Sequence, residues 1–216
     1  MAAARVAAAG LADRVHIELR AYRALEGQYS RIWMLREVDA SLRRLQTDHI
    51  DILYLHRDFP GIDLEEPLRA LDDLVRAGKI RHWGLSNFRG WRIAEMVHGA
   101  KRLNMPGPVV CQPYYNLLNR MPEVEILPAC AHHGIGVVPY SPVARGVLTG
   151  KYQPGAQPEP GSRAGRGDKR IAETEFRAES LAIAQQLQGH AQAKGVTLAQ
   201  FATAWVLANR AVSSVI

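Results

Sequence analysis

The sequence lacks several features that define common classes of protein. Only two cysteines, Cys111 and Cys130, occur in 216 residues, too few for a disulfide framework or a cysteine metal site. No segment approaches the roughly 20 apolar residues of a membrane span. The start, MAAARVAAAG, also lacks the leucine-rich core of a secretory signal. We therefore expect a cytoplasmic chain with no membrane partner, no bound metal and two buried thiols.

Positive charge is present but is not concentrated. The formal net charge is +6, yet no dense basic run with interleaved aromatic residues occurs, as a nucleic-acid-binding surface usually has. The composition, 47% hydrophobic and 22% charged, is that of a chain able to bury a core as one domain over residues 1–216. We therefore expect no nucleic-acid partner. The positive net charge is consistent with an enzyme that binds an anionic cofactor.

Short β-rich runs alternate with helical patterns along the chain, as in consecutive βα units with a parallel sheet. The expected strands are residues 15–22, 50–55, 80–85, 108–115, 135–140 and 212–216. The helices between them carry apolar stripes at helical spacing: Val38, Leu42 and Leu45; Leu68, Leu71 and Val75; Leu198, Ala202 and Trp205. Residues 153–170 are rich in Gly, Pro and Arg and too long for a simple connector, which leaves a functional cover loop or a disordered linker.

Capping signals support two of the helices. Asp63 and Glu66 form a capping-box pattern, and Gly78 suits a left-handed C-terminal cap. Thr197 and Gln200 repeat the box pattern before the helix that leads to the last strand. Both helices are therefore expected to begin with a side-chain cap.

Polar residues stand at the ends of several expected strands. They are His56, Ser86, Asn87, Gln112, Tyr140 and Ser141. In a parallel barrel, the carboxyl ends of the strands converge on one mouth, where the active site is expected. An open dinucleotide-binding sheet should carry GxGxxG after its first strand, and that motif does not occur here. The strand ends therefore favour a barrel over an open sheet.

Four motifs resemble successive strand ends of the aldo-keto reductases: HIDILYLH, IRHWGLSNF, VVCQPYYN and VVPYSPVARGVLTGKY. The resemblance includes the branch of that family related to voltage-gated potassium channel beta subunits. It implies an α/β fold of (β/α)8 TIM barrel type, of which this chain supplies strands three to eight. It also implies NADP(H) as cofactor and hydride transfer from NADPH to an aldehyde or ketone.

Hydride attack converts a carbonyl oxygen into an alkoxide, so such a site needs a proton donor and hydrogen-bond donors aimed at that oxygen. By resemblance, His56 orients the carbonyl. Ser86, Asn87 and Gln112 hold the nicotinamide carboxamide, and Tyr140 offers a ring face on which the nicotinamide stacks. These residues are therefore the candidates for binding the nicotinamide and the reacting carbonyl.

The segment after Tyr140 is suited to a pyrophosphate by its backbone and small side chains. By resemblance the contacting residues are Ser141, Pro142, Val143, Ala144, Arg145 and Gly146. Lys151 and Arg163 supply cations, and residues 161–163 close over the cofactor. Val143 stands where the family usually has Leu, a mild departure.

The resemblance also indicates which family positions fall outside this sequence. The catalytic Asp and Tyr positions precede Met1, and Arg20 stands in the place of the lysine, which makes it the second catalytic candidate. The loop that binds the 2′-phosphate follows Ile216. We therefore expect an N- and C-terminally incomplete barrel that associates through open sheet edges and reduces carbonyls poorly, unless extended upstream by about 60 residues.

The same residues bear on other possible functions. The sequence HRDF, which begins at His56, echoes a kinase catalytic loop, but no Gly-rich phosphate loop or DFG accompanies it. A non-catalytic nicotinamide-binding module of regulatory or structural type remains the main alternative to a reductase. A lyase or isomerase on the same barrel is a third, because a fold does not fix a function.

Overall fold

The chain is an α/β protein in the computed structural model, with a parallel sheet whose strands are separated by helices. The structure describes residues 16–19, 29–59 and 61–216, with only the main chain of residues 16–19. These residues form two compact parts. The sheet part contains the described residues of Met1–Gln112 together with Glu125–Gly136, and the helical part contains Pro113–Val124 and Val137–Ile216. A single domain over residues 1–216 stays a prediction.

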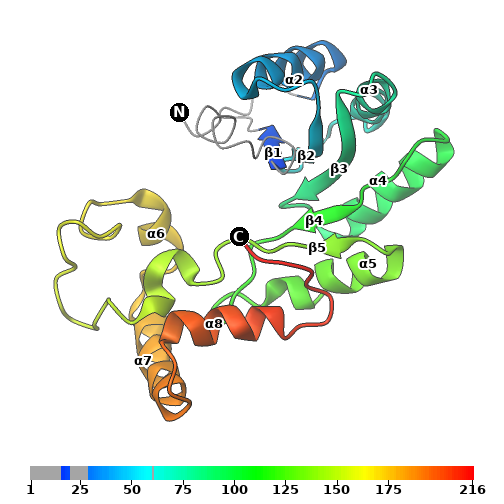
Figure 1. Ribbon diagram of the computed structural model, residues 1–216. Coiled ribbons are helices and arrows are strands. Elements are labelled where there is room, and N and C mark those ends of the chain that lie inside the picture. The colour runs from blue at the N-terminus through cyan, green and yellow to red at the C-terminus, as the bar shows by residue number, and fades with distance from the viewer. Residues whose placement is uncertain (1–15, 20–28, 60) are drawn as a thin grey trace. The chain divides into compact units, whose positions relative to one another are not determined.

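The sheet part is built on parallel strands that follow one another in chain order (Figure 1). They are β1 (His16–Leu19), β2 (Ile50–Leu55), β3 (Ile80–Ser86) and β4 (Val110–Gln112). β5 (Gly136–Val137) comes next, and the Gly136 N–H donates to the Val109 carbonyl oxygen at 3.0 Å. The parallel order and the intervening helices confirm the predicted βα organisation.

Prolines explain why two strands are shorter than predicted. β4 forms only between Pro108 and Pro113, neither of which has a main-chain N–H to give to a ladder. β5 covers two of the predicted residues 135–140, and Pro139 lies among the others. The pattern of apolar residues located both strands but overestimated their lengths.

The predicted strand at residues 212–216 is wrong as a continuous strand. Val212 makes only an isolated parallel bridge with Val137, and the Ser213 N–H donates to the Val137 carbonyl oxygen at 2.8 Å. The chain end near Ile216 makes strand-like main-chain hydrogen bonds as well, but they do not join into a ladder. The apolar pattern located an extended segment here and overstated its regularity.

Four helices accompany the sheet: α2 (Arg31–Leu45), α3 (Glu65–Arg76), α4 (Gly90–Arg102) and α5 (Ile126–His133). Figure 1 shows them along one side of the strands. Most of the predicted stripes are buried: Val38, Leu42 and Leu45 in α2, and Leu68 and Leu71 in α3. Val75 was predicted to complete the second stripe but is half-buried, and Leu74 is buried instead. Burying one apolar face of each helix against the strands is the main source of stability expected for such a layer.

The capping box predicted at the start of α3 does not form. The helix begins after Leu64, and the Asp63 carboxylate accepts the Glu65 N–H at 3.0 Å. The Glu66 carboxylate accepts the main-chain N–H of Arg31 at 2.9 Å rather than one in its own helix. Glu66 therefore contacts the start of α2 instead of completing a capping box in α3.

Two smaller predictions are confirmed in the sheet part. Gly78 follows α3 with φ 69°, the left-handed conformation expected of a glycine that ends a helix. Cys111 and Cys130 are both buried and unoxidised. Their thiols therefore belong to the core of this part.

The helical part contains η2 (Met121–Glu123), η3 (Ala144–Thr149), α6 (Lys169–Thr174), α7 (Ala178–Ala193) and α8 (Leu198–Leu207). The predicted capping box of α8 is confirmed, because Thr197 Oγ1 accepts the Gln200 N–H at 3.2 Å and Gln200 Oε1 accepts the Thr197 N–H at 2.9 Å. Leu198 and Ala202 are buried as predicted, while Trp205 is half-buried. Together these side chains place α8 on the core of this part.

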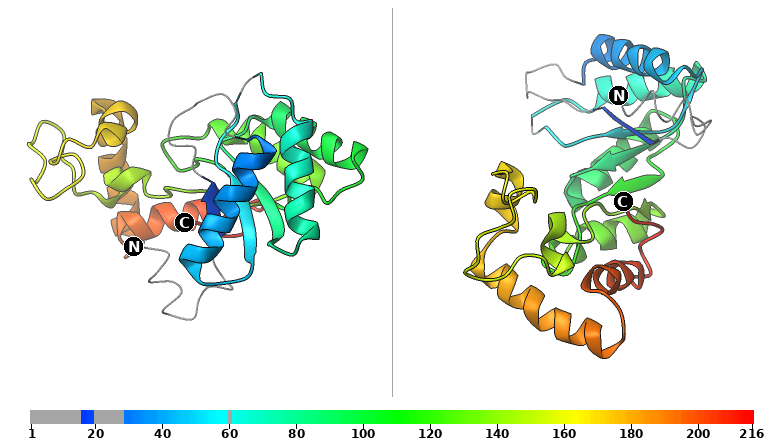
Figure 2. Two further views of the ribbon diagram at one scale, coloured as in Figure 1. Left: turned by 90° about the horizontal axis from the view of Figure 1, so that it is seen from above. Right: turned by 60° about the vertical axis from the view of Figure 1, so that its left-hand side comes forward.

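Residues 153–168 form an irregular stretch of turns between η3 and α6, drawn in yellow in Figure 2. The Ser162 hydroxyl donates to the Glu159 carbonyl oxygen at 2.7 Å, and the Gly165 N–H donates back to Ser162 Oγ at 3.1 Å. The stretch thus has internal hydrogen bonds of its own. Within the described part of the chain, no helix has both the length and the apolar character needed to cross a membrane.

Candidate functional site

The ends of β2, β3 and β4 meet at one edge of the sheet part. His56 directly follows β2, Asn87 directly follows β3, and Gln112 is the last residue of β4. The strands are parallel and in register, with Leu55 opposite Leu85 and Ser86 opposite Gln112. Parallel pairing therefore brings these three strand-end residues together.

Hydrogen bonds tie these strand ends to one another. Asn87 Nδ2 donates to the His56 carbonyl oxygen at 2.8 Å and to Ser86 Oγ at 3.1 Å. The Ser86 hydroxyl in turn donates to the Gln112 carbonyl oxygen at 2.9 Å. Asn87 has φ 58°, a left-handed conformation that Asn tolerates better than most residues. Ser86 and Asn87 therefore join the main chain of this edge at His56 and Gln112.

These residues differ in how far solvent reaches them. Ser86 is fully buried and Gln112 is 3% exposed, whereas His56 is half-buried and Asn87 is exposed. A carboxamide at the end of a buried strand can both donate and accept hydrogen bonds, and a half-buried imidazole can donate to a polar ligand atom. The edge is thus equipped to hold an amide and to polarise a carbonyl.

Tyr29 also belongs to this edge, although the sequence did not point to it. Its hydroxyl donates to the Arg57 carbonyl oxygen at 2.8 Å and accepts the Arg57 N–H at 3.2 Å. Its ring meets Phe59 edge-on, with centroids 5.1 Å apart. Burial raises the pKa of Tyr29 to about 12. Tyr29 therefore holds the main chain next to His56. Tyr29 and Arg57 are 28 residues apart, and no pattern of spacing in the sequence predicts this contact.

We expect Tyr29→Phe to lower the free energy of unfolding by about 1 to 2 kcal/mol, because it removes a hydroxyl that satisfies two main-chain groups of Arg57. The measurement is urea denaturation followed by far-UV circular dichroism. An unchanged midpoint and slope would mean that water replaces the hydroxyl at no cost.

In the helical part, Tyr140 begins the segment expected to hold phosphate. Its N–H donates to the Pro113 carbonyl oxygen at 3.0 Å, and its ring lies 5.2 Å from that of Tyr114 at an angle of 32°. Tyr140 is half-buried, so part of it remains open to solvent. A ring supported on one side by a second ring can offer its other face for stacking.

Residues 141–146, named here the left-handed turn, have an unusual backbone. Ser141, Ala144, Arg145 and Gly146 have φ values of 59°, 47°, 54° and 103°. The Ala144 N–H donates to the Ser141 carbonyl oxygen at 3.0 Å. Successive residues in such conformations can turn main-chain N–H groups toward one side, which makes a concave site for an anion. The N–H groups of Ser141, Ala144 and Gly146 donate to main-chain oxygens, so the candidates for a ligand are those of Val143 and Arg145. Apart from Gly146, no residue type in this segment predicts the left-handed conformation.

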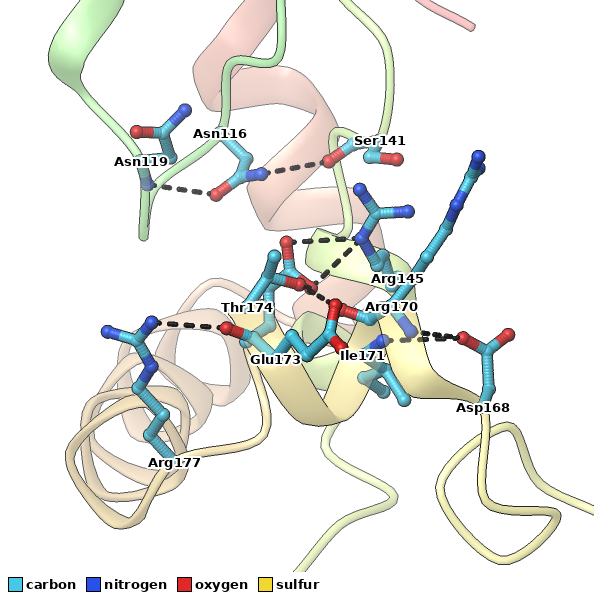
Figure 3. A network of polar contacts seen from close by, with 11 residues as sticks. Asn116, Asn119, Ser141, Arg145, Asp168, Arg170, Ile171, Glu173, Thr174 and Arg177 are labelled. Carbon is cyan, nitrogen blue, oxygen red and sulfur yellow. Dashed lines mark hydrogen bonds and ion pairs between the residues drawn. The ribbon is translucent and has the colours of Figure 1, made fainter. Parts of the chain in front are cut away.

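Two side chains from outside the turn lie next to its ends, one at Ser141 and one at Gly146. Asn116 Nδ2 donates to the Ser141 carbonyl oxygen at 3.1 Å (Figure 3). A Cβ built on Gly146 would lie 3.3 Å from Lys151 Nζ, so the Lys151 ammonium stands directly beside the turn. The remaining predicted members, Pro142 and Val143, are half-buried. The structure therefore brings a cation to the segment predicted to bind phosphate.

Of the last two candidates, Arg163 and Arg20, the structure describes only Arg163. Arg163 is exposed in the irregular stretch before α6, and its carbonyl oxygen accepts the Asp168 N–H at 3.1 Å. Arg20 lies outside the described residues, as does Tyr22. Among the side chains that the structure describes, no group of three or more His, Cys, Asp or Glu residues is arranged to hold a metal ion.

Comparison with known proteins identifies relatives that match 82 to 87% of this chain. A "probable voltage-gated potassium channel subunit beta" of Arabidopsis thaliana is 40% identical over 188 residues, which cover 87% of this chain and 57% of that protein. A putative aryl-alcohol dehydrogenase of Schizosaccharomyces pombe is 35% identical over 178 residues, 82% of this chain and 49% of that protein. An aldo-keto reductase of Alternaria alternata is 37% identical over 191 residues, 87% of this chain and 49% of that protein. The chain thus spans about half the length of the curated relatives it matches.

The model of the aldo/keto reductase family matches residues 6–216, which include all four strand-end motifs. These motifs supply the edge formed by His56, Asn87 and Gln112 and the left-handed turn that follows Tyr140. The chain belongs to the aldo/keto reductase family.

Proposed function

We propose that this chain carries the nicotinamide-binding and carbonyl-orienting residues of an NADPH-dependent reductase of aldehydes or ketones, built on a (β/α)8 barrel. The observation that carries the proposal is the edge at which His56, Asn87 and Gln112 end three consecutive parallel strands. Active sites of parallel barrels lie at that end of their strands. Family membership supplies the reaction class.

Each residue of the edge has a chemical task in this proposal. Gln112 and Asn87 bind the nicotinamide carboxamide and so select which face of the ring delivers hydride. The His56 imidazole donates a hydrogen bond to the carbonyl oxygen, where negative charge develops as hydride arrives. Ser86 acts indirectly, because its hydroxyl is used to hold the Gln112 main chain. When bound, NADPH supplies the hydride.

In the helical part, the left-handed turn and Lys151 are proposed to bind phosphate oxygens of the cofactor. Main-chain N–H groups and an ammonium are the donors that such oxygens take up most readily. The Tyr140 ring is proposed as the stacking surface for nicotinamide. Arg163, exposed before α6, is proposed to cover the cofactor once it is bound.

A regulatory nicotinamide-binding subunit is the second candidate. It is favoured by the names of relatives that are 36 to 40% identical, which are called voltage-gated potassium channel beta subunits. Titration of the chain with NADPH, followed by nucleotide fluorescence, should show saturable binding under both proposals. Oxidation of NADPH with a panel of aldehydes should occur only under the first. A chain that does not bind NADPH would contradict both.

Gln112→Leu is expected to raise the NADPH dissociation constant by about 5- to 150-fold, since a buried carboxamide partner worth about 1 to 3 kcal/mol is lost while side-chain volume is kept. Fluorescence titration measures the change. Gln186→Leu, on the exposed side of α7, is the matched control and should bind as the unsubstituted chain does. If both variants bind NADPH with equal affinity, Gln112 has only a structural role in the sheet.

A further inference from the structure

Arg145 and Glu175 form an ion pair inside the helical part. Arg145 Nε lies 3.0 Å from Glu175 Oε2 and 3.3 Å from Oε1, between η3 and the end of α6. The side chains are 12% and 4% exposed. Arg and Glu are almost never this buried unless they are paired, since an isolated charge would lose its hydration. Figure 3 shows Arg145 within the surrounding network of polar contacts.

The Arg145 side chain is therefore already engaged within the protein. Besides Glu175, its guanidinium carbon lies 5.4 Å from the centroid of the Tyr114 ring, within the range of a cation–π contact. Lys151, beside the left-handed turn, has an aromatic neighbour too, since its Nζ lies 5.1 Å from the centroid of the Tyr152 ring, but its side chain is exposed, so its ammonium can also meet a ligand. The two positive residues of this segment thus have different surroundings.

The backbone at Arg145 requires such support. Ala144 and Arg145 are consecutive non-glycine residues with φ of 47° and 54°. A left-handed conformation costs an L-residue roughly 1 to 2 kcal/mol, so it persists only where surrounding contacts favour it. The ion pair of Arg145 is a contact of this kind, because it anchors the side chain of one of the two strained residues.

Glu175 is held in place by the helix before it. Asp168 caps α6 by accepting the N–H groups of Arg170 at 2.9 Å and Ile171 at 3.3 Å, and Ile171 is buried in the core. The Thr174 hydroxyl donates to the Glu175 carboxylate. The short helix therefore presents Glu175 from a fixed position, at the far end of the irregular stretch 153–168.

We propose that the Arg145–Glu175 pair is a positioning device that holds the left-handed turn in the conformation needed to receive the phosphate groups of a dinucleotide. Neither side chain touches the ligand; Glu175 acts through Arg145, and Arg145 acts through its own main chain. The identity of the ligand rests on the proposed function, whereas the effect on the turn does not.

The test compares Glu175→Gln with Glu173→Gln, a matched change at an exposed position on α6. Hydrogen–deuterium exchange is measured on the turn, where the N–H groups of Ala144 and Gly146 donate to main-chain oxygens, and on α8 as an internal reference. We expect Glu175→Gln to speed exchange in the turn at least about 10-fold with α8 unchanged. It should also raise the NADPH dissociation constant about 10-fold, and Glu173→Gln should do neither.

The outcomes separate this proposal from the proposed function. If Glu175→Gln speeds exchange in the turn but the chain does not bind NADPH, the positioning role stands and NADPH is rejected as the ligand. Exchange in Glu175→Gln equal to that in Glu173→Gln would overturn the positioning role, whatever the cofactor affinity. Lys151→Met should weaken NADPH binding without changing exchange in the turn, because Lys151 is proposed to contact the ligand directly.

A second variant applies even if Glu175→Gln does not fold. Arg145→Lys keeps a positive charge beside Glu175 but removes the guanidinium Nε that lies 3.0 Å from Glu175 Oε2. It should speed exchange in the turn with α8 unchanged. Exchange in Arg145→Lys equal to that in Glu173→Gln would overturn the proposal.

Discussion

Replacing Gly84 with Ala is expected to lower the free energy of unfolding by about 3 kcal/mol, the upper end of the usual cost of overpacking. Gly84 lies in β3 between Tyr54 on β2 and Val110 on β4. A Cβ at this position would lie 2.6 Å from both Val110 Cγ1 and the Val110 carbonyl oxygen, and 3.1 Å from Tyr54 Cε1. A main-chain oxygen inside the sheet cannot move aside as a side chain can, so strands must separate.

Urea denaturation followed by circular dichroism measures this loss. Gly107→Ala is the matched control, because a Cβ on Gly107 would have no heavy atom within 4 Å and the residue does not have a positive φ. A domain of ordinary stability has about 5 to 15 kcal/mol to lose. Indistinguishable midpoints for the two variants would mean that β3 and β4 adjust to the methyl group, and that the close contact is not a requirement of the sheet.

Gly84 illustrates what the sequence could and could not predict about the sheet. The run IRHWGLS was identified as a strand because apolar and β-forming residues dominate it, which is a local property. The need for glycine within that run is not local, since it arises from the side chains that neighbouring strands place opposite it. β2 matched its predicted bounds, whereas the prolines around β4 shortened a strand that its apolar residues alone would extend.

The candidate site likewise contains some residues that could be predicted from the sequence and others that could not. His56, Asn87 and Gln112 could be grouped from the sequence because each ends a parallel strand, and parallel strand ends converge whatever their distance along the chain. Tyr29 and Glu175 could not, because their roles depend on tertiary contacts 28 and 30 residues away. The capping box at Asp63 failed for a related reason, as Glu66 found a partner in another helix.

The proposed chemistry leads to an expected loss of turnover in His56→Gln. If the imidazole donates a hydrogen bond to the reacting carbonyl, its removal should lower kcat/KM for aldehydes on the order of 100- to 10,000-fold. The NADPH dissociation constant should stay within about threefold, because the proposed contact is to the carbonyl and not to the cofactor. Oxidation of NADPH at saturating cofactor gives the first quantity, and fluorescence titration gives the second.

His82→Gln is the control for this substitution, since His82 is an exposed histidine on β3, the strand next to that of His56. It should leave both quantities unchanged. A chain that binds NADPH but never oxidises it would favour the regulatory subunit, and His56→Gln would then bind the cofactor as the unsubstituted chain does. Full turnover by His56→Gln would instead restrict His56 to its main-chain role, in which its carbonyl oxygen accepts the Asn87 amide at 2.8 Å and helps to join two strand ends.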